Sequence, residues 1–356
     1  MAMSVLAKQK SPLNVLAGSI TDAYAANFWL QKFNPLWSLQ QALGKVVQKQ
    51  QASADMVSLT LQVNRHFQMG DAGQHHPVYV VVNGIRYERT YSLTRLDASH
   101  VVLTVKKVQQ GIVSQWLANQ TQVGDILEFG QPYGDMTLAE NIAQPLVLLA
   151  AGSGITPMVS ILKRWSKQTE QQPIHLMYWV KHYADAAFKA YFEELAQQHA
   201  AFSFEIFYTQ EQQDGQRIHA DQLAQLPHLA QSIVYACGAA GFVSAAEACT
   251  QSTSLFKGEA FSMGEIVNDE LGFVNITLTQ SKQVITIPKG QSILSSLEQQ
   301  NIKPQHGCRM GICNKCACHK VEGSTKNLVN GQQNTEPGNL LKICVNSAQT
   351  DLVIDL

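Results

Sequence analysis

The sequence predicts a multidomain protein in which a small antiparallel β-barrel is followed by a doubly wound parallel α/β sheet and then by a short α+β domain. The first observation is a series of period-two apolar segments, separated by Gly and Asp turns, between residues 44 and 138. The second is an alternation of apolar strand-like runs with helical stretches between residues 145 and 261. The third is a group of four cysteines within residues 308–318, with Cys344 further along the chain.

Length and composition support this organisation. A chain of 356 residues is long enough for two or three domains. With 45% hydrophobic and 15% charged residues, it has the composition of a folded globular protein. Its net charge of −1 argues against a protein that binds nucleic acid. Because no apolar run reaches about 18 residues, we expect no membrane span.

Residues 1–43 predict a helical N-terminal arm. Aromatic residues recur there at helical spacing, and the pattern ends near Pro35: Tyr24, Phe28, Trp29, Phe33 and Trp37. We favour an arm that packs on the following domain. The alternative is a peripheral surface for a membrane or a partner protein.

Residues 44–140 predict the barrel, with strands at 56–63, 78–82, 87–93, 101–108 and 126–129. Within it, Arg89-Thr90-Tyr91-Ser92 precedes a turn from Gly111 to Ser114 that starts a helix. A flavin needs an aromatic face, a hydroxyl near its reactive nitrogen, and a cation with helix-terminal amides at its phosphates. Tyr91, Ser92 and Arg89 with the Gly111–Ser114 turn would supply these groups in that order. The alternative is that Tyr91 is a structural tyrosine.

Residues 141–262 predict the parallel sheet, with strands at 146–151, 174–180, 202–209 and 233–237. The first strand leads into a glycine turn that opens a helix and would hold a pyrophosphate: Gly152, Ser153, Gly154, Ile155, Thr156 and Pro157. A second glycine turn begins at Cys237-Gly238, at the same edge of the sheet. Cys237 would then lie beside a nicotinamide. The alternatives are an ordinary packing turn and an ordinary buried cysteine.

Residues 272–356 predict the small domain, with strands at 273–278, 284–287 and 352–354 and a helix at 293–300 that begins after Ser292. Cys308, Cys313 and Cys316 have the C-x4-C-x2-C spacing of a plant-type 2Fe-2S cluster, and Cys344 is the fourth ligand that such a cluster needs. The alternative is a zinc site made of Cys313, Cys316, Cys318 and His319. In the cluster interpretation, Cys318 is a buried side chain rather than a ligand.

Taken in order, these motifs resemble the ferredoxin-NADP reductase superfamily over residues 44–261, joined to a plant-type ferredoxin domain from about residue 272. The resemblance implies a β-grasp fold for the last domain, bound FAD, hydride transfer from NAD(P)H and relay of single electrons through the cluster. It also implies that Phe261 shields the flavin, and that Ser92 and Cys237 serve the hydride step with it.

The arm, the domain order and the C-R-M-G-I-C loop look like bacterial reductases that supply membrane acyl-CoA (fatty acid) desaturases. The same order resembles reductases of Rieske or di-iron oxygenases, which is the alternative. A cluster-based redox-sensing module is the alternative of another class. Clustered cysteines favour a reducing compartment, so we expect the cytoplasm, near the inner face of the membrane.

Two further expectations concern charge. Lys181-His182 follows the strand at 174–180 with no adjacent acidic residue, which favours the 2′-phosphate of NADPH over NADH. Residues 272–356 carry eight basic and five acidic residues. Arg309, Lys315 and Lys320 lie in or beside the cysteine loop, so we expect this domain to dock on an acidic partner surface.

Overall fold

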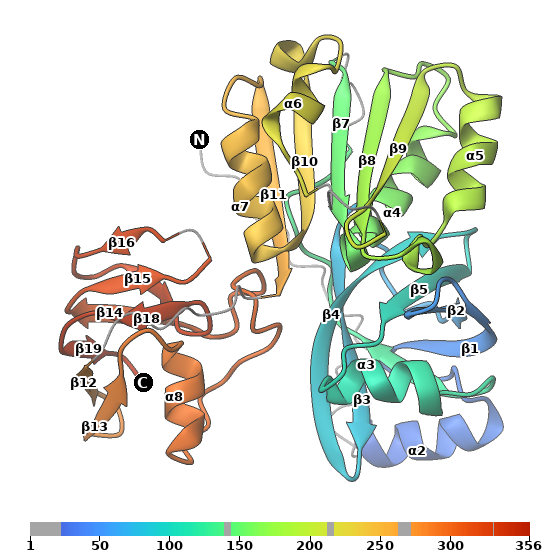
Figure 1. The fold of residues 1–356 in the computed structure, drawn as a ribbon. Coiled ribbons are helices and arrows are strands. Elements are labelled where there is room, and N and C mark those ends of the chain that lie inside the picture. The colour runs from blue at the N-terminus through green and yellow to red at the C-terminus, as the bar shows by residue number, and fades with distance from the viewer. Residues whose placement is uncertain (1–22, 139–143, 212–216, 263–271, 330) are drawn as a thin grey trace, which may run out of the picture.

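The computed structural model describes residues 23–138, 144–211, 217–262, 272–329 and 331–356, so the expectations for residues 1–22 lie outside it. The described chain forms a barrel, a parallel sheet with helices on its faces, and a smaller domain that lies beside both (Figure 1). No helix among the described residues is long and apolar enough to cross a membrane.

The barrel is closed by six antiparallel strands in the order β1-β2-β5-β4-β3-β6. Their bounds are Ala42–Gln51 for β1, Met56–Val63 for β2, His75–Val82 for β3, Ile85–Arg95 for β4, His100–Lys106 for β5 and Ile126–Phe129 for β6. The five predicted strands are present, and β1 is additional. The pairing of β1 with β2 shifts between Val46 and Gln48, and this irregularity interrupts the period-two pattern on which strand prediction depends.

An Asn-Gly turn joins β3 to β4. Asn83 and Gly84 both have positive φ, 51° and 76°. A two-residue turn of this kind matches the right-handed twist of an antiparallel pair. It sets the register in which His75 of β3 lies opposite Ser92 of β4.

The N-terminal arm is the helix α2 (Ala23–Phe33). Asn27 attaches it to the following turn, because the side-chain oxygen of Asn27 accepts hydrogen bonds from the Leu39 amide at 2.8 Å and the Ser38 hydroxyl at 3.2 Å. The aromatic stripe does not pack as expected: Trp29 is 65% exposed and Phe33 is 81% exposed. A buried polar residue therefore fixes the helix and leaves its aromatic face open.

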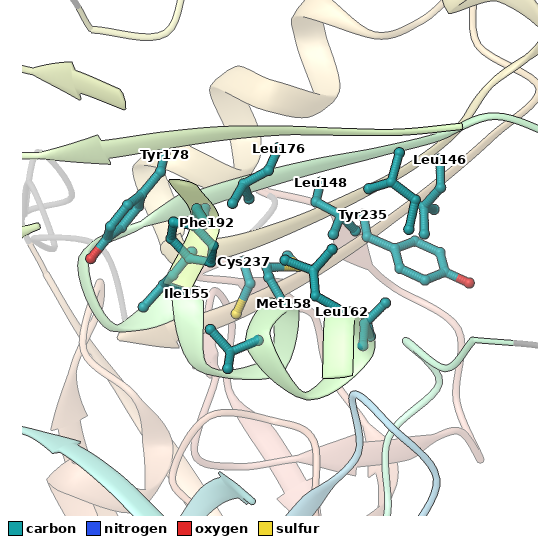
Figure 2. Close-up of a cluster of buried hydrophobic side chains, with 14 of the residues drawn as sticks. Leu146, Leu148, Ile155, Met158, Leu162, Leu176, Tyr178, Phe192, Tyr235 and Cys237 are labelled. Atoms are coloured by element: carbon teal, nitrogen blue, oxygen red, sulfur yellow. The ribbon is translucent and has the colours of Figure 1, made fainter. Parts of the chain in front are cut away.

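The second domain is a five-stranded parallel sheet in the order β11-β10-β7-β8-β9. Its strands are β7 (Leu146–Ala151), β8 (Ile174–Val180), β9 (Phe202–Tyr208), β10 (Ile233–Ala239) and β11 (Leu255–Ser262), and its helices are α4 (Ile155–Trp165), α5 (Lys189–Gln198), α6 (Ala220–Ala224) and α7 (Ala240–Cys249). Apolar side chains of the sheet pack against α4 (Figure 2). The Ser160 hydroxyl of α4 donates to the Leu93 carbonyl of the barrel at 2.9 Å, which joins the two domains.

The third domain contains a five-stranded sheet in the order β13-β12-β19-β14-β17 and a three-stranded sheet, β16-β15-β18. The elements are β12 (Phe273–Leu278), β13 (Gln283–Pro288), α8 (Ile293–Gln299), β14 (Ala317–Glu322), β15 (Thr325–Asn327), β16 (Gln333–Asn334), β17 (Leu340–Lys342), β18 (Asn346–Ala348) and β19 (Leu352–Ile354). The Ser292 hydroxyl caps α8 by accepting from the Ser295 amide at 3.2 Å. The cysteine loop connects α8 to β14.

Candidate functional site

A cavity of about 330 Å³ lies where the three domains meet, and it collects the residues that the sequence assigned to a flavin. β4 contributes Arg89, Tyr91 and Ser92, the short helix α3 (Ile112–Gln115) contributes Ser114, and Gly111 precedes that helix. The other predicted residues on its wall are Ser153, Thr156 and Phe261. The wall is completed by Cys308, Arg309 and Met310 of the cysteine loop, which the sequence had not placed there.

The electrostatics of this cavity favour an anion. Burial lowers the pKa of Arg89, and the neighbouring guanidinium of Arg309 lowers it further. Arg89 donates to the carbonyl of Glu88 at 2.7 Å, and no carboxylate of the described residues forms an ion pair with it. Arg309, by contrast, is held by two hydrogen bonds to Glu298, at 2.8 and 2.6 Å. Arg89 is a half-buried cation with no acidic partner among the described residues. A phosphate of the flavin would therefore fit beside its guanidinium.

Ser92 is the first member of a buried hydrogen-bonded chain. Its hydroxyl lies 2.8 Å from Nδ1 of His75, and Nε2 of His75 bonds to Oε2 of Glu259. All three side chains are buried. With Glu259 accepting from Nε2–H, Nδ1 accepts from the Ser92 hydroxyl. This chain fixes the Ser92 oxygen in the cavity and offers a route by which a proton could reach Glu259.

Sequence reasoning missed His75 and Glu259. They are 184 residues apart and belong to β3 and β11, in different domains. Glu259 lies two residues before Phe261, so the motif around Phe261 is the sequence feature that could have indicated Glu259 as a site residue. Its carboxylate can be assigned a role only when the partner histidine is known.

A second cavity, of about 640 Å³, opens along the carboxyl edge of the parallel sheet. Its lining includes the predicted residues Gly152, Lys181 and Gly238. Phe261 lines both cavities and packs edge-on against His75 with ring centroids 5.4 Å apart. The aromatic ring therefore stands where a flavin in one cavity would meet a dinucleotide in the other.

Three further predicted residues, Gly154, Pro157 and Cys237, are not among the residues that line the second cavity. An added Cβ on Gly154 would overlap the carbonyl oxygen of Cys237, so this glycine allows the helix turn to approach β10. Pro157 is buried in the first turn of α4. Cys237 lies in the apolar core near Ile155 and Met158 (Figure 2), with its side chain fully buried and the pKa of its thiol raised by burial.

The surroundings of Lys181 differ from the expectation in one respect. Glu211, which is 29 residues beyond His182, bonds to His182 Nδ1 at 3.1 Å and accepts from the Tyr183 amide at 3.2 Å. Glu211 therefore adds an acidic residue at the tip of β8 to Asp185, which is near in sequence, accepts from the His182 amide at 3.2 Å and lines the second cavity. Arg217, which sequence reasoning also missed, lines the same cavity as Lys181.

The four predicted cluster ligands come together as two pairs. The Sγ atoms of Cys316 and Cys344 are 3.1 Å apart. Cys308 and Cys313 are joined by amide-to-sulfur bonds in both directions, at 3.2 and 3.4 Å. A binuclear cluster needs two thiolates on each iron, so this pairing fits it. Arg309, Gly311 and Asn314 have φ of 61°, 76° and 57°, which bends the loop so that its amides point toward the sulfurs.

The zinc alternative does not fit this geometry. Cys318 is buried on β14, whereas the adjacent His319 is exposed on the opposite side of that strand. Within the described residues, no three His, Cys, Asp or Glu side chains converge as a single metal ion would require. Cys318 instead packs in the core of the small domain, as expected of a residue that is not a ligand.

The three cations from which we expected a basic docking surface have partners within the chain, so they do not form a free basic surface, and docking on an acidic partner stays a prediction. Arg309 is paired with Glu298. Lys315 Nζ lies 2.6 Å from Oε2 of Glu88 on the barrel. Lys320 is buried and donates to the backbone and side-chain oxygens of Asn334. The sequence gives the number of these charges, but their intramolecular partners are known only from the folded chain.

Three protein-family models match the chain in the same order as the three domains. They are an oxidoreductase FAD-binding domain over residues 43–138, an oxidoreductase NAD-binding domain over 148–248 and a 2Fe-2S iron-sulfur cluster binding domain over 276–346. The chain is an oxidoreductase of the ferredoxin reductase type. The cofactors expected from the sequence, FAD, a nicotinamide dinucleotide and a 2Fe-2S cluster, are confirmed at this level.

Individual relatives support the same assignment. An NADPH oxidoreductase of Mycobacterium tuberculosis is 28% identical to this chain. The match covers 97% of this chain and 92% of the relative. The phthalate 4,5-dioxygenase oxygenase reductase subunit of Pseudomonas putida is 27% identical to this chain. The match covers 80% of this chain and 87% of the subunit. The solved structure of a phthalate dioxygenase reductase shares the fold of this chain, with a TM-score of 0.63 and 24% identity. The match covers 89% of this chain and 98% of that structure.

Proposed function

We propose that the reductase accepts hydride from NADPH and passes single electrons to the terminal component of an oxygenase. The observation that carries the proposal is that Cys308 and Met310 of the cluster loop lie on the wall of the flavin cavity, together with Tyr91 and Ser92. Bound FAD takes up a hydride as an electron pair, and the cluster accepts electrons one at a time.

The chain's own residues position these groups. Arg89 and the Gly111–Ser114 turn would hold the flavin phosphates, while Tyr91 would lie against the ring system. Phe261 would cover the flavin until the nicotinamide displaces it. Cys308, Cys313, Cys316 and Cys344 would hold the cluster. Because hydride transfer needs no acid or base at the carbon atom, positioning carries this step.

An oxygenase acceptor is favoured because the named relatives include electron-transfer components of dioxygenases. The test supplies the purified reductase with NADPH and either a Rieske oxygenase component or membranes that contain a desaturase. We expect turnover with the oxygenase component. A chain that reduces neither acceptor, nor cytochrome c, would contradict electron delivery and would favour the redox-sensing alternative.

A membrane desaturase is the second candidate, and α2 is the observation that favours it. Its exposed face carries Phe28, Trp29, Lys32 and Phe33. The first 54 residues contain five lysines and one acidic residue. Aromatic side chains with lysines are typical of helices that lie on anionic membranes. In the same test, turnover only with the membrane acceptor would select this candidate. The described residues include all seven cysteines and no disulfide joins them, which suits a reducing compartment; we therefore propose a cytoplasmic location, near the membrane in this case.

The coenzyme proposal gives a quantitative prediction. Lys181 and Arg217 line the second cavity and would contact a 2′-phosphate. We expect the double variant Lys181→Ala/Arg217→Ala to raise the KM for NADPH by about 10-fold to 100-fold, since it removes two charge-assisted contacts. The KM for NADH should change little. Steady-state kinetics with both coenzymes is the measurement, and an equal rise for both would contradict the assignment.

A further inference from the structure

Among the described residues, a short ion pair joins the small domain to the barrel. Lys315 of the cluster loop lies with its Nζ 2.6 Å from Oε2 of Glu88 on β4, and it also donates to the Tyr79 hydroxyl on β3 at 3.1 Å. Glu88 is the residue immediately before Arg89 of the flavin cavity, and Lys315 lies between Cys313 and Cys316. The contact therefore connects the two cofactor sites directly.

Burial makes this ion pair costly to break. The side chain of Glu88 is only 13% exposed, and that of Lys315 is 35% exposed. Gly307 of the cluster loop approaches Glu88 so closely that an added Cβ would lie 2.7 Å from Oε1. That Oε1 is buried and has no hydrogen-bond partner among the described residues. Removing Lys315 would leave a buried carboxylate unpaired unless the domains separate and let water in.

Neighbouring side chains hold Tyr79 and Glu88 in place. The Arg86 guanidinium lies 4.2 Å from the centre of the Tyr79 ring, and Lys315 Nζ lies 5.4 Å from it. Arg86 is itself bonded to Glu128 of β6 at 2.9 Å. Because three barrel strands support the acceptor of the ion pair, its position follows the rigid barrel rather than a loop.

We propose that the Lys315–Glu88 ion pair positions the small domain so that the cluster loop closes the flavin cavity, and that it thereby sets the rate at which electrons reach the cluster. This inference rests on the proposed function only for the electron step. In that step one electron leaves the reduced flavin and one is gained by the cluster, and no atom is transferred. Since electron transfer slows steeply with distance, a displaced loop would slow this step and not hydride uptake.

The test compares Lys315→Glu, Glu88→Lys and the double variant that exchanges the two charges. In single-turnover mixing with NADPH, we expect each single variant to reduce its cluster at least 10-fold more slowly than the wild type. The exchanged pair should recover to within threefold. Lys315→Met, which leaves no like charge beside Glu88, should fall between them. Lys303→Glu makes the same charge change on an exposed part of the same domain and should not alter the rate.

Small-angle X-ray scattering of the same proteins without NADPH supplies a readout that does not depend on activity. The single variants should show a larger radius of gyration, and the exchanged pair should return to the wild-type value. Wild-type rates and dimensions in folded single variants would overturn the proposal. So would a double variant that is no faster than the singles. If the wild type itself passed no electrons to its cluster, the proposed function would fail while the scattering comparison still tested the ion pair.

Discussion

Replacing Cys344 with serine will remove the 2Fe-2S cluster and reduce electron delivery to a protein acceptor by at least about 100-fold, because a cluster of this type needs four thiolates. Cys344 is 3.1 Å from Cys316, and together they form one of the two thiol pairs. Serine offers a hydroxyl that remains protonated near neutral pH and binds iron poorly. Ferricyanide reduction by the flavin should persist.

The matched control is Cys318→Ala, which removes a cysteine two positions beyond Cys316. Cys318 lies in the apolar core, so we expect normal iron content and relay, with a small loss of stability. Iron analysis, visible absorption and cytochrome c reduction make the comparison. Loss of the cluster in Cys318→Ala, or its retention in Cys344→Ser, would show that the wrong fourth ligand was chosen.

Replacing Ser92 with alanine will lower the rate of flavin reduction by about 100-fold, the size of effect that a small misplacement of the reacting groups produces. The Ser92 hydroxyl is the only member of the Ser92–His75–Glu259 chain whose side chain reaches the described wall of the flavin cavity together with Tyr91. Its loss would remove the oxygen that faces the flavin and would leave Nδ1 of His75 without its partner. Stopped-flow mixing with NADPH measures this rate.

Threonine at position 92 keeps the hydroxyl and should recover most of the rate. The KM for NADPH should change less than kcat in the alanine variant, because Ser92 is not among the residues that line the dinucleotide cavity. A Ser92→Ala protein that takes up hydride at the wild-type rate would remove Ser92 from the hydride step.

Local sequence patterns predicted the fold well, because each pattern records a local physical requirement. The period-two runs of β2 and β6, the apolar runs of β7 and β8 and the serine cap of α8 coincide with the observed elements. β1 was missed because its bulge breaks the alternation. The aromatic stripe of α2 was assigned to packing, although periodicity cannot distinguish a buried face from an exposed one.

The site residues also fall into those that local motifs predicted and those that they did not. Residues carried by short motifs, such as Arg89, Tyr91, Ser92 and the cluster cysteines, reach the cavity or the thiol pairs. Partners that meet only after folding were not predictable from the motifs: His75 with Glu259, and Lys315 with Glu88. A count of charges therefore suggested a free basic surface where the folded chain has internal ion pairs.

The most direct test of the account mixes the holoprotein with NADPH in the absence of oxygen and any acceptor, and follows flavin and cluster absorption separately. We predict that the flavin band bleaches first and that the cluster band then bleaches within the same turnover. A flavin that stays fully reduced beside a cluster that remains oxidised would contradict electron transfer between the two sites.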